Sequence, residues 1–89
     1  MVGFLLDQNY PNPFSEKTSI KYTIPKTGRV ILRVYDFAGR PVTTLVNSKQ
    51  SAGTYTVDFL ASYYFDTHFY YTIYLDKYFL TKKMLMLNK

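Results

Sequence analysis

The side chains able to catalyse a reaction or bind a metal are few in this sequence and far apart. His68 is the only histidine of the 89 residues and there is no cysteine, so a zinc site built from imidazole and thiolate ligands is not expected. Ser62, Asp66 and His68 could be drawn as a hydrolytic triad, but such a trio arises by chance in a loop. The aspartates lack calcium-loop spacing, and the glycines lack the spacing of a phosphate-binding loop. We therefore predict no enzyme, no metal and no cofactor.

Aromatic side chains are concentrated in one segment, 60–80. The chain holds ten tyrosines and seven phenylalanines, and more than half of them lie in this segment, which has no glycine or proline. Tyrosine offers a large, rigid contact area at low entropic cost, so the composition favours a protein-binding surface. The residues expected to contact a target are Tyr63, Tyr64, Phe65, Asp66, His68, Tyr70, Thr72, Tyr74, Lys77 and Tyr78.

Two other interpretations of the aromatic segment stay open. It could form a thick aromatic core with a few ordinary exposed tyrosines. Its uncharged window, 69–75, could also pair edge to edge with a second copy of the chain. If Phe69, Tyr71 and Ile73 point inward, the residues between them face solvent, and the opposite register fits the pattern equally well.

The charge of the chain limits its partners only weakly. The net charge is +5, with lysines and arginines scattered rather than in runs, which permits an anionic partner without requiring one. We do not expect nucleic acid to bind, because the cations of the aromatic third are few and Asp66 and Asp76 lie among them. No apolar run could span a membrane, and residues 1–6 are too short for a signal peptide, so neither feature is expected.

Short alternating runs separated by turn residues fill most of the chain. In the first of them, Ile20, Tyr22 and Ile24 alternate with polar residues, as in a half-buried strand. We expect strands at 4–6, 18–24, 30–35, 41–46, 54–59, 69–75 and 84–87, the last in a central or inter-sheet position, with a loop at 47–53. This pattern predicts one all-β domain over 1–89, an antiparallel sandwich of about seven strands. Its expected core is Ile20, Tyr22, Ile24, Val30, Leu32, Val34, Leu45, Tyr55, Val57 and Phe59.

A proline-rich segment, 1–17, precedes the first long strand. Two prolines flank Asn12, and because each fixes φ and lacks an N–H, the segment cannot form a helix or a central strand. We expect an irregular lead-in in which Asn9 and Asn12 cap turns through their side chains. Tyr10 and Phe14 are the aromatic residues expected to close one end of the core.

The lead-in and four later motifs resemble the sorting domain at the C-terminus of proteins exported by the type IX secretion system. The matching segments are 6–14, 18–25, 34–42, 52–55 and 81–85. The resemblance implies an immunoglobulin-like sandwich of about seven strands. It also implies a tag that the secretion machinery recognises at the outer membrane, in a family exported to the surface or outside of Gram-negative bacteria. The positions it would assign to sorting are Asn9, Pro11, Asn12, Pro13, Phe14, Asp36, Gly39, Arg40, Gly53, Lys82, Lys83 and Met84.

Two glycine positions of the family pattern carry other residues in this chain. Tyrosines follow Ala61 and Ser62 in place of a glycine-containing turn, and Asp76 stands at the later glycine. Because backbone positions with φ > 0 disfavour bulky residues, these changes favour deliberate diversification. We therefore expect a non-catalytic protein-binding module on a sorting-domain scaffold, with segment 60–79 engineered to recognise a macromolecule. The alternative is an unmodified sorting domain that directs the export of a cargo protein, with its signal in 9–14 and 82–84.

Overall fold

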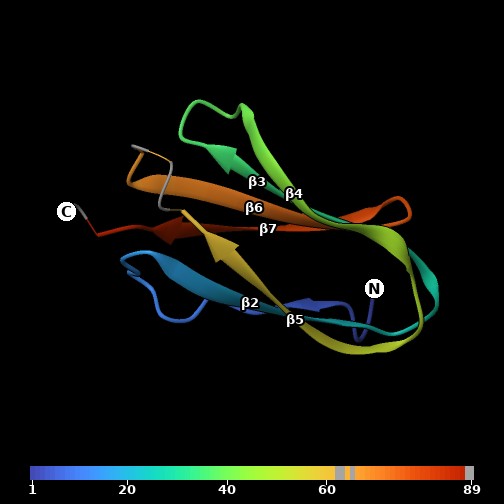
Figure 1. Cartoon of the computed structure of the whole chain (residues 1–89). Helices are drawn as coiled ribbons and strands as arrows, with labels where there is room; N and C mark the ends of the chain where they lie inside the picture. Colours follow the sequence, from blue (N-terminus) through green and yellow to red (C-terminus); the bar gives the residue numbers. More distant parts are fainter. Residues whose placement is uncertain (62–63, 65, 88–89) are drawn as a thin grey trace.

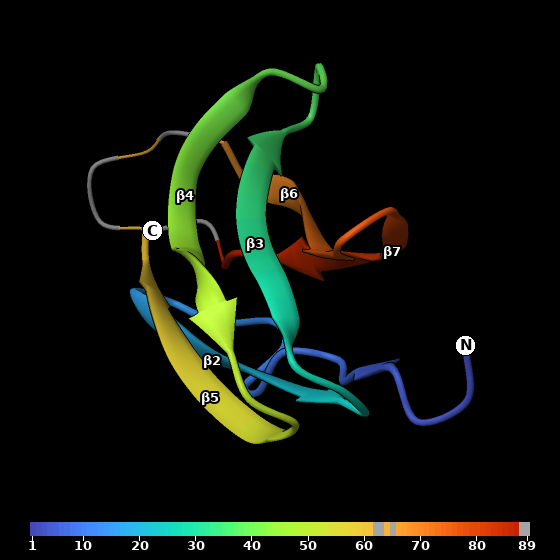
Figure 2. The ribbon, with the colours of Figure 1, turned by 90° about the vertical axis from the view of Figure 1, so that its right-hand side faces the viewer.

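The chain folds into two β-sheets that pack face to face (Figures 1 and 2). The structure is a computed structural model that describes residues 1–61, 64 and 66–87, and these residues contain no helix. The strands are β1 (Leu5–Leu6), β2 (Lys17–Ile24), β3 (Gly28–Asp36), β4 (Pro41–Gln50), β5 (Gly53–Leu60), β6 (His68–Leu75) and β7 (Tyr78–Leu85). One sheet has the order β1-β2-β5 and the other β4-β3-β6-β7, with every pair antiparallel. The predicted all-β sandwich of immunoglobulin-like type is confirmed.

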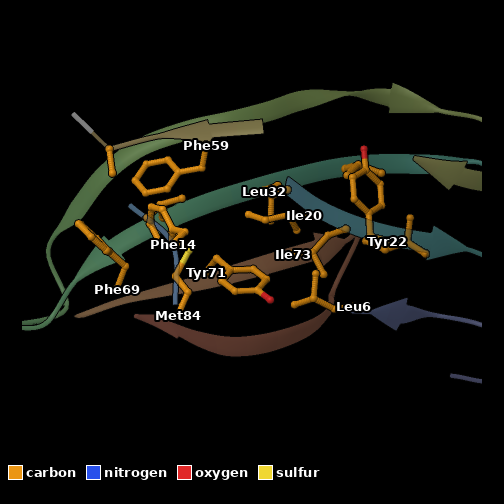
Figure 3. Packing of buried hydrophobic residues seen from close by; sticks show 14 of the residues in the cluster. Leu6, Phe14, Ile20, Tyr22, Leu32, Phe59, Phe69, Tyr71, Ile73 and Met84 are labelled. Atoms are coloured by element: carbon orange, nitrogen blue, oxygen red, sulfur yellow. The ribbon is translucent and has the colours of Figure 1, made fainter. Parts of the chain in front are cut away.

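The core lies between the sheets and is formed by alternate residues of each strand. Along β2 and β3 every second side chain is buried, as the alternation of apolar and polar residues predicts. Seven of the ten predicted core residues are buried. The other three, Leu45, Tyr55 and Val57, pack against the core but are only partly buried, because β4 and β5 are edge strands of their sheets. Figure 3 shows aromatic rings from both sheets meeting at one end of this core.

The aromatic strand β6 takes the first of its two possible registers. Phe69, Tyr71, Ile73 and Leu75 are fully buried, and β6 lies between β3 and β7. A strand with neighbours on both edges brings its inward side chains to the middle of the core, where large rings replace solvent contact with packing. The inward half of β6 is therefore core, as one of the interpretations left open above expected in part.

Two strand boundaries differ from those expected from the sequence. The predicted loop at 47–53 is mostly strand: β4 continues to Gln50 because β3 begins at Gly28 and supplies pairing partners along its whole length. The final strand is expected from the sequence at 84–87, in a central or inter-sheet position, whereas β7 spans Tyr78–Leu85 at the edge of its sheet. The apolar residues on both of its faces have a different cause, since the lead-in covers the end of this edge.

A tyrosine hydroxyl joins the lead-in to the larger sheet. The hydroxyl of Tyr71 accepts a hydrogen bond from the backbone N–H of Asn9 at 2.8 Å and donates one to the backbone carbonyl of Asp7 at 2.7 Å. Burial raises the pKa of Tyr71 to about 12. Because the hydroxyl uses both its donor and an acceptor lone pair on one short stretch of backbone, it fixes the path of the lead-in after β1.

An aspartate forms the turn between β6 and β7 in the left-handed conformation. Asp76 has φ of 52° and stands where the family pattern has a glycine. Its carboxylate accepts a hydrogen bond from the backbone N–H of Arg29 at 3.2 Å and lies 3.7 Å from the Lys26 ammonium. Aspartate tolerates this conformation better than most residues because its short side chain can bond locally.

We expect Tyr71→Phe to lower the free energy of unfolding by about 1–3 kcal/mol, because the buried N–H of Asn9 loses its acceptor. Urea unfolding measures the loss, with Tyr70→Phe on the solvent side of the same strand as the control. Since the folded-state pKa of about 12 exceeds the ordinary 10.0, the contribution of Tyr71 is complete below pH 10 and is lost as pH rises toward 12. The variant should therefore lose less stability over that interval. If Tyr71→Phe and Tyr70→Phe lowered the free energy of unfolding equally, this role of Tyr71 would be contradicted.

We expect Asp76→Ala to cost about 1–2 kcal/mol, because alanine gains nothing locally to offset the left-handed backbone and the bond to Arg29 is removed. Asp76→Asn keeps a side-chain oxygen and tolerates the same φ, so its effect should stay below about 0.5 kcal/mol. Thermal unfolding of both variants provides the comparison. If alanine proved as stable as asparagine, the turn would not depend on this side chain.

Candidate functional site

The two ends of the predicted sorting motif lie side by side in the fold. The side-chain amide of Gln8 donates to the carbonyl oxygen of Lys83 at 2.7 Å, and Asn12 Oδ1 accepts from the N–H of Leu85 at 2.9 Å. The backbone N–H of Phe14 donates to the carbonyl of Leu85 at 3.0 Å. These contacts follow the outer edge of β7, so the lead-in supplies hydrogen-bond partners that a neighbouring strand would otherwise supply.

The Asn9 side chain stabilises the conformation of the lead-in through hydrogen bonds. Its side-chain amide donates to the carbonyl of Pro11 at 3.1 Å and to the hydroxyl of Thr18 at 3.0 Å, and Thr18 donates to the same carbonyl at 2.8 Å. Asn9 and Thr18 are both buried. The expected turn-capping role of Asn9 is therefore confirmed, whereas Asn12 caps the edge of a distant strand instead of its own turn.

The two aromatic residues of the lead-in have opposite environments. Phe14 is buried and packs edge to face on Phe59, with ring centroids 6.1 Å apart. Tyr10 is 81% exposed, so its predicted place in the core is wrong. The reason is its backbone pairing with Ser19, since residues directly opposite on neighbouring strands share a face, and Ser19 faces outward.

The β3–β4 turn is closed by Asp36, one of the positions that the resemblance assigns to sorting. Its carboxylate accepts hydrogen bonds from the backbone N–H and from Nε of Arg40, both at 2.9 Å, and Gly39 has φ of 87°. The bond from the Arg40 backbone lowers the pKa of Asp36, against the opposing effect of burial. This turn lies at the same end of the sandwich as the loop of the lead-in that precedes β2 (Figure 1).

The remaining sorting positions do not gather into one surface. Gly53 opens β5 at the opposite end of the molecule. Met84 is fully buried, while Lys82 is half-buried and Lys83 exposed. The prolines that flank Asn12 are exposed. Several sorting residues thus build the fold, and only part of the motif is presented to solvent.

The predicted target-binding residues are also dispersed. Tyr64 is partly buried, with its ring 5.9 Å from Phe59 and 6.1 Å from Phe69, so it belongs to the core. Tyr63 and Phe65 lie outside the described residues. The aromatic segment therefore contributes less open surface than its composition suggests.

The other predicted contacts are spread along the length of β6. His68 is half-buried beside Phe37, with ring centroids 5.7 Å apart, and Asp66 is exposed next to it. Lys77 and Tyr78 are exposed in the turn at the other end, about 24 Å away for a strand of this length. Thr72, which is also expected from the sequence to contact a target, is buried.

One set of side chains does form a continuous surface, on the outer side of the larger sheet. Strand register aligns three rows of residues across β3, β6 and β7. We refer to them as the aromatic face: Ile31, Tyr74 and Phe79; Arg33, Thr72 and Thr81; Tyr35, Tyr70 and Lys83. The sequence pattern placed the β6 residues and the outward direction of β3, but the pairing of distant strands that unites them could not be deduced from local alternation.

The centre of the aromatic face is a hydrogen-bonded cluster. The hydroxyls of Tyr35 and Tyr74 are 3.3 Å apart, and they come from the rows on either side of Thr72, which explains the burial of that residue. The Tyr35 hydroxyl raises the pKa of Tyr74, and the nearby charge of Arg33 partly opposes the shift. Arg33 Nε donates to the Thr44 hydroxyl at 3.2 Å.

The part of the chain that the structure describes contains no group of three or more side chains able to hold a metal ion. A hollow of about 320 Å³ at the lead-in end is lined by Pro13, Thr67, His68, Leu85, Met86 and Leu87, a mainly apolar set with one titratable group. Among the described residues, no helix could cross a membrane.

We expect Asn12→Ala to speed hydrogen exchange of the Leu85 amide by about two- to tenfold, the equivalent of one hydrogen bond of about 0.5–1.5 kcal/mol. NMR exchange measurements would detect this change, because the amide would then face water instead of the Asn12 side chain. The amide of Leu32 in the central strand should be unaffected. Asn47→Ala, on the strand at the other edge of the sheet, is the matched control. If Asn47→Ala sped exchange of the Leu85 amide as much as Asn12→Ala does, the protection of that amide by Asn12 would be contradicted.

Comparison with known families agrees with this arrangement. The family model described as the secretion system C-terminal sorting domain matches residues 8–85. This span runs from Gln8 to the end of β7, so it includes both the lead-in residues and the strand edge that they contact. No curated protein and no solved structure matches the chain. The chain belongs to the family of type IX secretion C-terminal sorting domains.

Proposed function

We propose that this chain is a sorting signal that directs a cargo protein to the type IX machinery for export across the outer membrane. The observation that carries the proposal is the family match over residues 8–85. The family consists of non-enzymatic signal domains. The secretion machinery is the proposed partner.

The signal that we propose is the folded domain and not a linear peptide. Asn9, Phe14 and Met84 are buried, so a receptor cannot contact these side chains while the sandwich is intact. Their effect on recognition must then be indirect, through the surface that they hold in place. The exposed residues of the lead-in and the nearby end of β7 are the parts of the motif that a receptor could touch directly.

The interpretation as an engineered binder stays a prediction, and the family match favours the sorting function over it. Its central argument was that two glycines had been replaced. At the later position, Asp76 adopts the left-handed backbone and is stabilised there by contacts with Arg29 and Lys26. This replacement is therefore compatible with an ordinary sorting domain and does not require design.

Export of a reporter tests the proposal. A periplasmic reporter enzyme carrying residues 1–89 at its C-terminus should reach the medium in a Gram-negative host with a type IX system. It should stay in the periplasm in a mutant that lacks the system, and so should the reporter without the tail. Release that did not depend on the tail would refute the function.

A second pair of tails tests whether the fold itself is recognised. Phe14→Ala should abolish export, because loss of a buried aromatic side chain costs about 3–5 kcal/mol. Leu60→Ala is the control, since Leu60 is 59% exposed on β5 and its loss should leave export unchanged. Normal export of the Phe14→Ala tail would show that a linear segment is sufficient.

A further inference from the structure

The two outer surfaces of the sandwich differ sharply in chemistry. On the smaller sheet, β2 and β5 present hydroxyls and a paired charge: Ser19 donates to Asp58 at 2.7 Å, Lys17 lies 3.9 Å from the same carboxylate, and Thr23 contacts Thr54 at 2.9 Å. The aromatic face on the larger sheet carries no aspartate or glutamate at any of its positions. Its cations, Arg33 and Lys83, therefore have no carboxylate within the face.

Hydrogen-bond donors without a partner among the described residues remain on the β3 side of the aromatic face. Among the described residues, the Arg33 side chain makes its hydrogen bond from Nε to the Thr44 hydroxyl. The N–H groups of its two terminal nitrogens therefore remain available to a ligand. The Tyr35 and Tyr74 hydroxyls can satisfy each other with one donor only, so the second O–H is available as well. An arginine fork beside a phenolic donor is suited to a carboxylate, because two parallel N–H groups match its two oxygens.

The size of the aromatic face limits what can occupy it. Three rows along the strands span about 14 Å, and the three strands β3, β6 and β7 span about 10 Å in the other direction. Such a patch is much smaller than the roughly 800 Å² that each partner contributes to a standard interface. It therefore suits a short segment better than the surface of a globular protein. Tyrosine and arginine are also the residues most enriched at the centres of protein-binding patches.

We propose that the aromatic face docks a short acidic peptide segment of a protein on the export route, with Arg33 on β3 as the main carboxylate contact and Lys83 on β7 as a second one. This inference rests on the proposed sorting function, because that function supplies the partner. The tyrosine rings provide apolar contact area around the charged centre. Other occupants, namely an acidic glycan, a nucleic acid or a second copy of the chain, are separate outcomes of the test.

The binding test uses the whole chain and a blocked peptide of alternating glutamate and alanine residues, followed by NMR. We expect shifts confined to the aromatic face, and no binding of the matching glutamine–alanine peptide. The double variant Arg33→Gln/Lys83→Gln should weaken binding by roughly tenfold or more. Lys17→Gln/Lys21→Gln removes the same charge from the opposite face and should change it little. If Arg33→Gln disturbs the sheet, Lys83→Gln alone should still weaken binding more than Lys21→Gln.

Several results would overturn the proposal. If the two double variants weakened peptide binding equally, the binding would reflect the net charge of the chain and not the aromatic face. If the glutamate peptide did not bind at all, the proposed site would be refuted. Tighter binding of oligogalacturonate or oligothymidine would assign the face to a glycan or a nucleic acid. A dimer in light scattering that the Arg33→Gln/Lys83→Gln variant abolishes would make a second copy the occupant.

The export assay separates this proposal from the sorting function itself. If the wild-type tail is exported and the Arg33→Gln/Lys83→Gln tail is not, while Lys17→Gln/Lys21→Gln is, both stand. If all three tails are exported equally, the sorting function stands and the acidic partner on that route is refuted. If even the wild-type tail fails, the sorting function falls, and with it the partner that this inference names.

Discussion

The fold depends on the docking of an irregular lead-in against both sheets. Tyr71 of the larger sheet bonds to the backbone at Asp7 and Asn9, while the ring of Phe14 packs on Phe59 of the smaller sheet. A sandwich of this size buries a modest core, so contacts that cross between its layers contribute much of its stability. The lead-in also covers the end of an edge strand that would otherwise be open to pairing with another chain.

The sequence predicts elements well where local alternation decides the outcome. Ile20, Tyr22 and Ile24 are buried because polar residues separate them, and Asp36 closes its turn through bonds to a residue four positions away. Prediction fails where a distant partner decides. The length of β4 follows from the start of β3, and the lead-in pairs beside the end of the β7 edge. Neither pairing can be recognised from the residues of β4 or of β7 alone.

The difference between local pattern and distant pairing also explains which predicted site residues lie together in the structure. Composition marked segment 60–80 as aromatic but could not separate Tyr64 and Tyr71, which pack inward, from Tyr70 and Tyr74, which line the outer face. That face is completed by residues of β3 and β7, which only the strand register brings beside them. The sorting motif divides in a similar way: its buried members hold the fold, and its exposed members are available to a receptor.

The hydrogen bond between Gln8 and Lys83 spans 75 positions of the chain, and this separation has a consequence for biosynthesis. A ribosome releases the lead-in long before it has made β7, so the first segment of the domain must wait for the last before the edge can close. A tail cut short by premature termination or proteolysis would lack the strand on which the lead-in docks. A receptor that requires the closed domain would thereby accept only cargo whose synthesis had reached that strand, and recognition would include a check that the polypeptide is intact.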